Sequence, residues 1–119
     1  MNPLFLQYPR CNTSNKAGKW LREHGIDVTS RDITIDNPTR EELAEWIARS
    51  GLPLRKFFNT SGLKYKELNM KDRIKTATDD ELVGLLASDG KLVKRPLLVL
   101  PDRVLVGFSE EEWARQLLK

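Results

Sequence analysis

The sequence predicts an α/β protein with the element order βαβ, then a block of helices, then ββα, and three observations indicate it. A short apolar run near the N-terminus is followed by apolar residues at helical spacing, as expected where a strand leads into a helix. Three later segments carry a hydroxyl residue with a glutamate three positions on, which is typical of helix starts. Two β-rich runs near the C-terminus flank a Pro-Asp turn, which indicates a hairpin.

The first third of the chain predicts a strand, a cysteine loop, a helix and a second strand. Residues 4–8 form an apolar and aromatic run that Pro9 ends, because proline cannot donate a hydrogen bond to a sheet. The helix that follows ends at a histidine and a glycine, His24 and Gly25. Residues 27–33 contain the β-branched side chains that favour a strand.

Three helices are predicted to begin at a capping box, in which a hydroxyl and a glutamate side chain satisfy two unpaired backbone N–H groups. The three pairs are Thr39 with Glu42, Thr78 with Glu81, and Ser109 with Glu112. Between the first two lies a basic stretch, residues 51–75, in which residues 63–68 predict a short helix. Its aromatic residues either form a partner-binding surface with the basic residues around them or belong to the core. The residues concerned are Phe57, Phe58 and Tyr65, with Lys64, Lys66, Lys71, Arg73 and Lys75.

A hairpin and a helix end the chain. Residues 97–100 and 104–108 are β-rich runs around the turn Pro101-Asp102-Arg103. A βαβ unit followed by a ββα unit is the thioredoxin-like arrangement, here with helices inserted at about residues 39–88. We expect one domain over residues 1–119, because the chain is too short for a second domain with its own hydrophobic core.

Composition excludes several classes of protein. The chain has 39% hydrophobic and 31% charged residues, which is ordinary for a globular protein and too apolar for a disordered one. Its apolar runs are far shorter than the ~20 residues that cross a bilayer, and we expect no signal peptide. The formal net charge of +3 is too mild to indicate direct nucleic-acid binding. We therefore expect a cytoplasmic monomer without membrane or direct nucleic-acid contacts.

The one cysteine, Cys11, is the main candidate for chemistry. It cannot form an intramolecular disulfide, and it lies between the first strand and the first helix. Unpaired N–H groups at a helix start stabilise a thiolate, and Ser14 is placed to donate a hydrogen bond to the sulfur. Arg10 and Lys16 add positive charge nearby, which lowers a cysteine pKa. The alternative interpretation is a buried structural cysteine, with Ser14 capping the helix.

Arg95 and Pro96 precede the apolar strand at residues 97–100. If the peptide bond between them is cis, the chain turns sharply and brings the start of this strand against the cysteine loop. Arg95 then faces whatever Cys11 binds, and its guanidinium holds an oxyanion or a thiolate. The alternative is a trans proline that opens a strand, with Arg95 in solvent.

The remaining chemistry-bearing residues indicate no second site. His24 is the only histidine, and its place at a helix end indicates that it complements the helix dipole rather than pairing with Cys11. One cysteine and one histidine cannot assemble a zinc site of usual composition. The sequence also lacks a glycine-rich phosphate loop, and we expect no bound cofactor.

Several motifs together resemble the arsenate-reductase-like (ArsC) family, and within it the Spx/MgsR branch. The resemblance covers essentially the whole chain. It implies a thioredoxin-like fold with a helical insertion and a redox-active cysteine at Cys11. The motifs are the Cys11-Asn12-Thr13-Ser14 loop, the Lys94-Arg95-Pro96 segment, residues 51–62 with Tyr65 and Leu68, and residues 106–112.

Two departures from the family pattern bear on the chemistry that the resemblance implies. Ser14 stands where many members of the Spx branch carry a second cysteine, so an intramolecular disulfide switch cannot form. Glutaredoxin-coupled arsenate reductases also carry C-x-x-S, and they use three arginines around the oxyanion. Arg95 matches one of these arginines, whereas the other two positions fall on Asn59 and Gly107, which implies a depleted arsenate pocket.

The residues and the resemblance together predict a cytosolic monothiol oxidoreductase. The Cys11 thiolate forms a mixed disulfide or another covalent adduct, which an external thiol resolves. This external thiol is a low-molecular-weight thiol, a glutaredoxin or a thioredoxin. Ser14 stabilises the thiolate, and Arg95 holds an anionic group of the substrate or of the resolving thiol.

The alternative function is transcriptional regulation without catalysis. Spx-type regulators bind the C-terminal domain of the RNA polymerase α-subunit through a loop glycine in the inserted region. A gapless comparison places Pro53 at that position, and Gly51 lies two residues earlier. Gly51 and Pro53 are therefore the candidate partner-binding residues.

Overall fold

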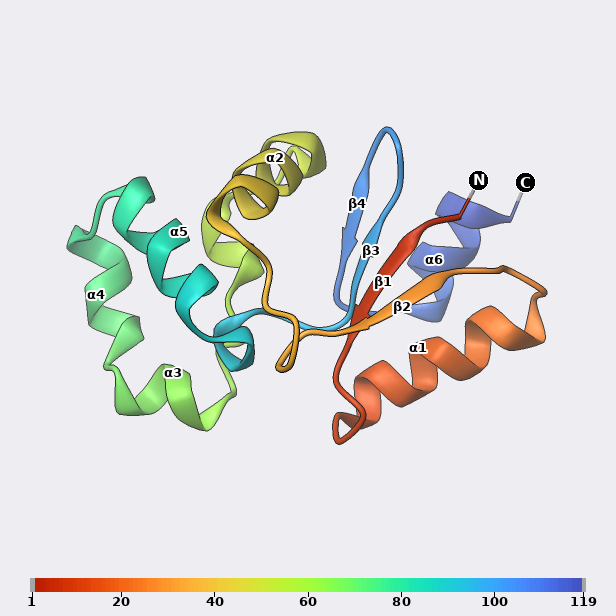
Figure 1. Cartoon of the computed structure of the whole chain (residues 1–119), viewed down its shortest axis with the longest axis horizontal. Coiled ribbons are helices and arrows are strands. Elements are labelled where there is room, and N and C mark those ends of the chain that lie inside the picture. Colours follow the sequence, from red (N-terminus) through yellow and green to blue (C-terminus); the bar gives the residue numbers. More distant parts are fainter. Residues whose placement is uncertain (1, 119) are drawn as a thin grey trace.

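The computed structural model, which describes residues 2–118, contains a four-stranded mixed sheet (Figure 1). β1 runs parallel to β2, with Leu4 opposite Thr29. β1 also runs antiparallel to β3, with Phe5 opposite Leu98, and β3 and β4 form the predicted hairpin. The strands lie in the order β2-β1-β3-β4, with the bounds β1 (Leu4–Gln7), β2 (Thr29–Asp32), β3 (Leu97–Val99) and β4 (Val104–Val106).

Two groups of helices flank the sheet (Figure 1). α1 (Asn12–Glu23) and α6 (Glu110–Leu117) lie together on one side, and the helices between β2 and β3 lie on the other. This second group, the helical block, comprises α2 (Arg40–Ser50), α3 (Leu63–Glu67), α4 (Met70–Thr76) and α5 (Asp79–Ser88), with the 3₁₀ turns η1 (Leu54–Phe57) and η2 (Gly90–Leu92). The order of elements is thioredoxin-like, which confirms the predicted fold class. Among residues 2–118, no helix is long and apolar enough to cross a bilayer.

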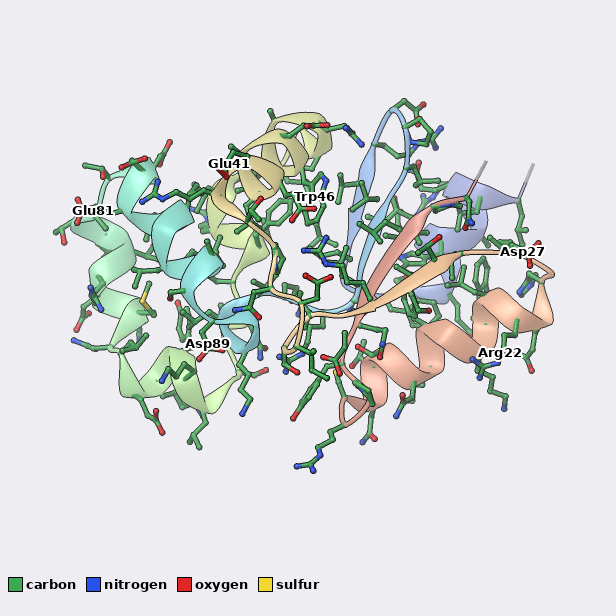
Figure 2. The ribbon with its side chains drawn as sticks, viewed as in Figure 1. Arg22, Asp27, Glu41, Trp46, Glu81 and Asp89 are labelled. Atoms are coloured by element: carbon green, nitrogen blue, oxygen red, sulfur yellow. The ribbon has the colours of Figure 1, made fainter. Side chains whose placement is uncertain are left out.

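The two faces of the sheet supply two hydrophobic cores, because successive side chains of a strand point to opposite faces. On one face, Phe5 packs with Trp20 of α1 and Trp113 of α6. On the other face, Leu6 belongs to a cluster that includes Trp46 of α2. Trp46 lies on the side of α2 that faces the sheet (Figure 2). The sheet is therefore held between α1 and α6 on one side and the helical block on the other.

The aromatic residues of the basic stretch belong to the core. Phe57 and Phe58 are fully buried, and the Tyr65 ring packs 6.3 Å from the ring of Phe58. A backbone bridge between Phe58 and Val93 ties this segment to the chain that leads into β3. The interpretation of these aromatics as a partner-binding surface is therefore wrong, whereas most of the neighbouring basic residues are exposed.

Two local predictions differ from the structure for identifiable reasons. β2 is shorter than the predicted residues 27–33, because its partner β1 pairs with it only from Leu4, opposite Thr29, to Gln7, opposite Asp32. The capping boxes of α2 and α5 are complete, but that of α6 is half formed. There the Ser109 hydroxyl accepts from the backbone N–H of Glu112. The Glu112 carboxylate instead accepts from the side chains of its own helix at Arg115 and Gln116.

Arg31 of β2 joins the sheet to the helical block. Its guanidinium donates two hydrogen bonds to the Glu42 carboxylate of α2, at 2.8 and 2.9 Å, and one to the carbonyl of Asn37 at 3.0 Å. The same group lies 5.9 Å over the ring of Trp46. This two-point contact holds the pKa of Glu42 down to about 2, because Arg31 favours the ionised carboxylate over the neutral acid, against the effect of burial.

Replacing Glu42 with Gln is expected to destabilise the protein at neutral pH and to matter less in acid. A depressed carboxylate pKa contributes stability above about pH 4.5, and this contribution is lost as the pH falls toward about 2. Because Glu42 is about one third exposed, we expect a loss of only ~1–2 kcal/mol in the free energy of unfolding at pH 7. Urea unfolding of the wild-type protein and the variant at pH 7 and pH 3 measures this loss, with Glu41→Gln as the matched control. Equal losses at both pH values would contradict this role.

Candidate functional site

Cys11 lies between β1 and α1, as the sequence predicted. It is the N-cap residue of α1, with an extended backbone, and its own side chain makes no capping hydrogen bond. The Cys11 N–H donates to the carbonyl of Tyr8 at 2.9 Å, and the Cys11 carbonyl accepts from the N–H of Asn15 at 3.0 Å. The side chain is partly exposed. The alternative of a fully buried structural cysteine is therefore wrong.

Ser14 lies inside the first turn of α1 and is only 2% exposed. Its hydroxyl oxygen accepts a hydrogen bond from the backbone N–H of Tyr8 at 3.2 Å, which leaves the hydroxyl proton free to donate. The interpretation of Ser14 as the N-cap is wrong, because Cys11 occupies that position. Ser14 is instead a buried hydroxyl that links the end of β1 to the sulfur of Cys11.

The pKa of Cys11 is lower than that of a free cysteine. Burial raises this pKa, but hydrogen bonds from the backbone and side chain of Ser14, the Arg95 side chain and the Thr13 backbone outweigh it. The predicted contributions of Arg10 and Lys16 are not among these interactions, since both side chains are exposed. The thiolate is thus stabilised by the opening turn of α1 and by Arg95, not by the charges next to it in the sequence.

Arg95 is held beside the cysteine loop. The Arg95–Pro96 peptide bond is cis, which is one of the two alternatives left open by the sequence. The guanidinium lies 4.9 Å over the ring of Tyr8, so Arg95 does not extend into solvent. Its Nη1 is shielded from water and meets no hydrogen-bond acceptor within the described residues. An unpaired buried donor is unfavourable, by about 1–3 kcal/mol, unless an anion accepts from it.

Cys11 lines a cavity of about 440 Å³. Three segments far apart in the sequence form most of its wall. In the loop before α3, the resemblance had already placed Asn59 at the pocket, whereas Ser61 and Gly62 were not predicted, although the Asn-Thr-Ser-Gly composition of this loop marks a turn. Backbone hydrogen bonds from Asn59 to Leu92 and from Lys94 to Phe57 hold this loop against the segment before β3. The lining residues are Cys11 and Thr13, then Asn59, Ser61 and Gly62, then Lys94 and Arg95, and finally Phe108.

His24 lies at the far end of α1 from Cys11. Its ring Nδ1 hydrogen-bonds to the carbonyl of Trp20 at 2.9 Å, and the ring stacks on the Trp20 side chain with centroids 4.2 Å apart. This confirms that His24 serves the C-terminal end of the helix and does not pair with Cys11. Residues 2–118 contain no group of three or more His, Cys, Asp or Glu side chains that could hold a metal ion.

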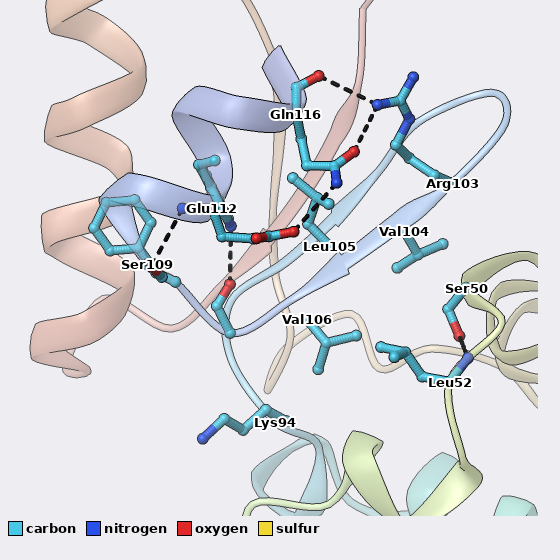
Figure 3. A pocket seen from close by; sticks show the side chains of 13 residues that line it. Ser50, Leu52, Lys94, Arg103, Val104, Leu105, Val106, Ser109, Glu112 and Gln116 are labelled. Atoms are coloured by element: carbon cyan, nitrogen blue, oxygen red, sulfur yellow. Dashed lines mark hydrogen bonds between the residues drawn. The ribbon is translucent and has the colours of Figure 1, made fainter. Parts of the chain in front are cut away.

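A second cavity, of about 520 Å³, lies between the hairpin, α6 and the end of α2 (Figure 3). It contains no nucleophilic sulfur, so its larger volume does not make it the chemical site. Leu52 lines it, between the exposed residues Gly51 and Pro53 that were predicted to bind a partner. Gly51 ends α2 with a φ of 69°, a left-handed conformation that favours glycine. Neither Gly51 nor Pro53 is among the residues that line the Cys11 cavity.

Comparisons with known proteins agree on one family. The model of the ArsC family matches residues 6–116. YusI of Bacillus subtilis, an uncharacterized protein, is 48% identical over 113 residues, which cover 95% of this chain and 96% of YusI. The regulatory protein MgsR of the same organism is 31% identical over 108 residues, which cover 91% of this chain and 84% of MgsR.

Two solved structures share the fold over nearly the whole chain. An ArsC family related protein from Bacteroides fragilis is 57% identical, with a TM-score of 0.93 and 97% of each chain covered. A possible arsenate reductase from Streptococcus mutans is 39% identical, with a TM-score of 0.84, and the match covers 92% of this chain and 95% of that one. On the match of residues 6–116 and on these relatives, the chain belongs to the ArsC family.

Proposed function

We propose that this protein is a monothiol oxidoreductase in which the Cys11 thiolate reacts with a disulfide. The observation that carries the proposal is the placement of a partly exposed cysteine, Cys11, at the N-cap of α1 and in the wall of a cavity. Membership of the ArsC family and similarity to a possible arsenate reductase support thiol chemistry at this site. The protein acts in a reducing compartment, the cytoplasm, where such a thiol stays available.

The proposed reaction is a thiol–disulfide exchange in two stages. The ionised Sγ of Cys11 attacks one sulfur of the substrate disulfide, and the other sulfur leaves as a thiolate. An external thiolate then attacks the substrate sulfur of this mixed disulfide, and Cys11 leaves as the thiolate. A second external thiol completes the reduction, so two external thiols are oxidised to one disulfide while the substrate becomes two thiols. A low-molecular-weight thiol, a glutaredoxin or a thioredoxin serves as the reductant, with no bound cofactor.

Ser14, Thr13 and Arg95 have distinct roles in this proposal. The backbone N–H groups of Thr13 and Ser14 and the Ser14 hydroxyl stabilise the attacking thiolate, and they stabilise it again when it leaves. The Arg95 side chain adds a further hydrogen bond to the thiolate, and its buried Nη1 has no acceptor among the described residues. The structural role of Pro96 is to direct Arg95 toward the cysteine loop.

The cavity favours a disulfide over arsenate as substrate. Of the three positions that hold an oxyanion in the reductases that this chain resembles, only Arg95 carries a charge here. Asn59 contributes a neutral amide to the cavity wall, and Gly107 has no side chain. Lys94 is the other cation on this wall, but an ammonium group lacks the planar fork of a guanidinium, so the cavity has only one of the three forked contacts to an oxyanion.

The Cys11 thiol is expected to titrate below the free value of about 8.5. We expect Ser14→Ala to raise this pKa, because the variant loses a side-chain hydrogen bond to the charged sulfur. The rate of alkylation by iodoacetamide against pH measures it, with circular dichroism to confirm folding. Ser61→Ala, in the same cavity but outside these hydrogen bonds, is the matched control. If the alkylation rate of the wild-type protein has its midpoint at about pH 8.5 or above, the proposed mechanism is contradicted.

The folded protein is expected to form one mixed disulfide per chain with 2-hydroxyethyl disulfide. Excess external thiol removes the adduct and sustains turnover, because the exchange regenerates the Cys11 thiolate. Mass spectrometry follows the adduct, and a coupled assay follows turnover. Cys11→Ser abolishes both. An adduct that external thiol cannot remove, or turnover that survives in Cys11→Ser, would refute the proposed reaction.

A second candidate function is regulation through RNA polymerase. One observation favours it, because Leu52, which is 41% exposed, stands between Gly51 and Pro53 at the rim of the larger cavity. The similarity to the regulatory protein MgsR is consistent with such a surface. Its proposed partner is the C-terminal domain of the α-subunit.

If the regulatory proposal holds, that α-subunit domain binds this protein at micromolar concentration or below. We expect Leu52→Asp to weaken binding at least about tenfold, because it places an unpaired charge in an apolar contact. Cys11→Ser leaves the affinity unchanged, since the thiol lies outside the surface. Isothermal titration calorimetry measures both, and the absence of a complex at micromolar concentration would discard this function.

A further inference from the structure

Lys94 brings a second cation to the wall of the Cys11 cavity. It precedes Arg95 directly, and its backbone is fixed by a 2.7 Å hydrogen bond from its N–H to the carbonyl of Phe57. The side chain is exposed, and none of the ion pairs among residues 2–118 includes its ammonium group. Lys94 is therefore a positive charge at the cavity that no protein carboxylate neutralises.

Gly107 leaves room for the Lys94 side chain, because it has no Cβ. A Cβ at position 107 would lie 3.3 Å from Cε of Lys94, tighter than an ordinary contact, and the φ of +75° also favours glycine there. In Figure 3, Lys94 points away from Leu52 and Val106, which line the second cavity. The side chain thus passes over Gly107, and Lys94 lines both the second cavity and the Cys11 cavity.

The charges of the Cys11 cavity do not balance. Its charged lining residues are Lys94, Arg95 and, once ionised, Cys11, with no carboxylate among them. The interactions that stabilise the thiolate come from Ser14, Arg95 and Thr13, and not from Lys94. One positive charge is left over after the thiolate and the guanidinium offset each other. In a concave site, such a charge raises the local concentration of anions and speeds their encounter.

We propose that Lys94 is a specificity-determining residue that selects anionic substrates, so that the site takes a disulfide bearing a carboxylate close to its sulfur atoms. The inference rests on the proposed function, since it concerns the substrate class of the Cys11 thiol. Lys94 pairs with the carboxylate while the Cys11 Sγ attacks the nearer sulfur. The second sulfur leaves as a thiolate, so the carboxylate takes no part in bond making or breaking. Thr13, Asn59 and Ser61 supply neutral polar groups around it.

Three disulfides of similar size and different charge test this proposal. They are 3,3′-dithiodipropionate, which is a dianion, 2-hydroxyethyl disulfide, which is neutral, and cystamine, which is a dication. Rate constants for the reduced protein are measured at low and high salt and divided by those of a small free thiol. We expect the wild-type protein to prefer the dianion, with a preference that salt reduces.

Lys94→Gln is expected to lower the rate with the dianion by about fivefold and to leave the neutral rate unchanged. The alkylation midpoint of Cys11 stays the same in this variant, and Lys94→Arg restores the preference. Lys71→Gln, which removes an equal charge from the exposed surface of α4, is the matched control and leaves all three rates unchanged.

The outcomes separate this inference from the proposed function. An equal ratio of dianion to neutral rates in the wild-type protein and Lys94→Gln overturns the role of Lys94, while the neutral rate still supports the thiol chemistry. A shifted alkylation midpoint with all three rates lowered alike also overturns it, because Lys94 would then act on the sulfur. A folded wild-type protein that reacts with none of the three disulfides refutes the proposed function itself.

Discussion

The hydrogen bonds at the opening turn of α1 are the constraint on which the site depends. Taking the sulfur partly out of water disfavours its charge, and the Ser14 and Thr13 backbone with the Ser14 hydroxyl reverse that effect. The same hydroxyl accepts the N–H of Tyr8, so the residue that follows β1 also orients the Ser14 side chain beside Cys11. A change that moved the start of α1 by one residue would lose both functions of Ser14.

The helical block contributes to the site as well as to the fold. Arg31 fixes α2 to β2 through Glu42, and the backbone pairing of Asn59 and Phe57 with residues 92–94 ties the block to the start of β3. Asn59 thereby lines the same cavity as the sulfur. In this protein, the inserted helices form one wall of the thiol cavity, so its shape depends on the packing of two hydrophobic cores.

The two cavities suit different kinds of partner. The cavity at Cys11 combines a sulfur, two cations and neutral polar groups, which suits a small charged molecule. The cavity beside Leu52 is bordered by the hairpin and by the exposed end of α2, which suits a macromolecular surface. Lys94 and Phe108 line both. A thiol function and a docking function can therefore coexist on one chain without sharing the reactive atom.

The sequence alone determined the order of elements, because capping residues, turn residues and apolar spacing report the local backbone. It also placed Cys11 before a helix, and the resemblance to the ArsC family gave the fold. The sequence and the resemblance also named Ser14 and Arg95 beside the sulfur. Only the tertiary structure showed that Ser61 and Lys94 line the same cavity as Cys11, because packing rather than nearness along the chain brings them there. Arg10 and Lys16 are near Cys11 in the sequence, but their side chains are exposed and do not lower its pKa. Arg95, which is 84 positions away, does lower it through a side-chain hydrogen bond.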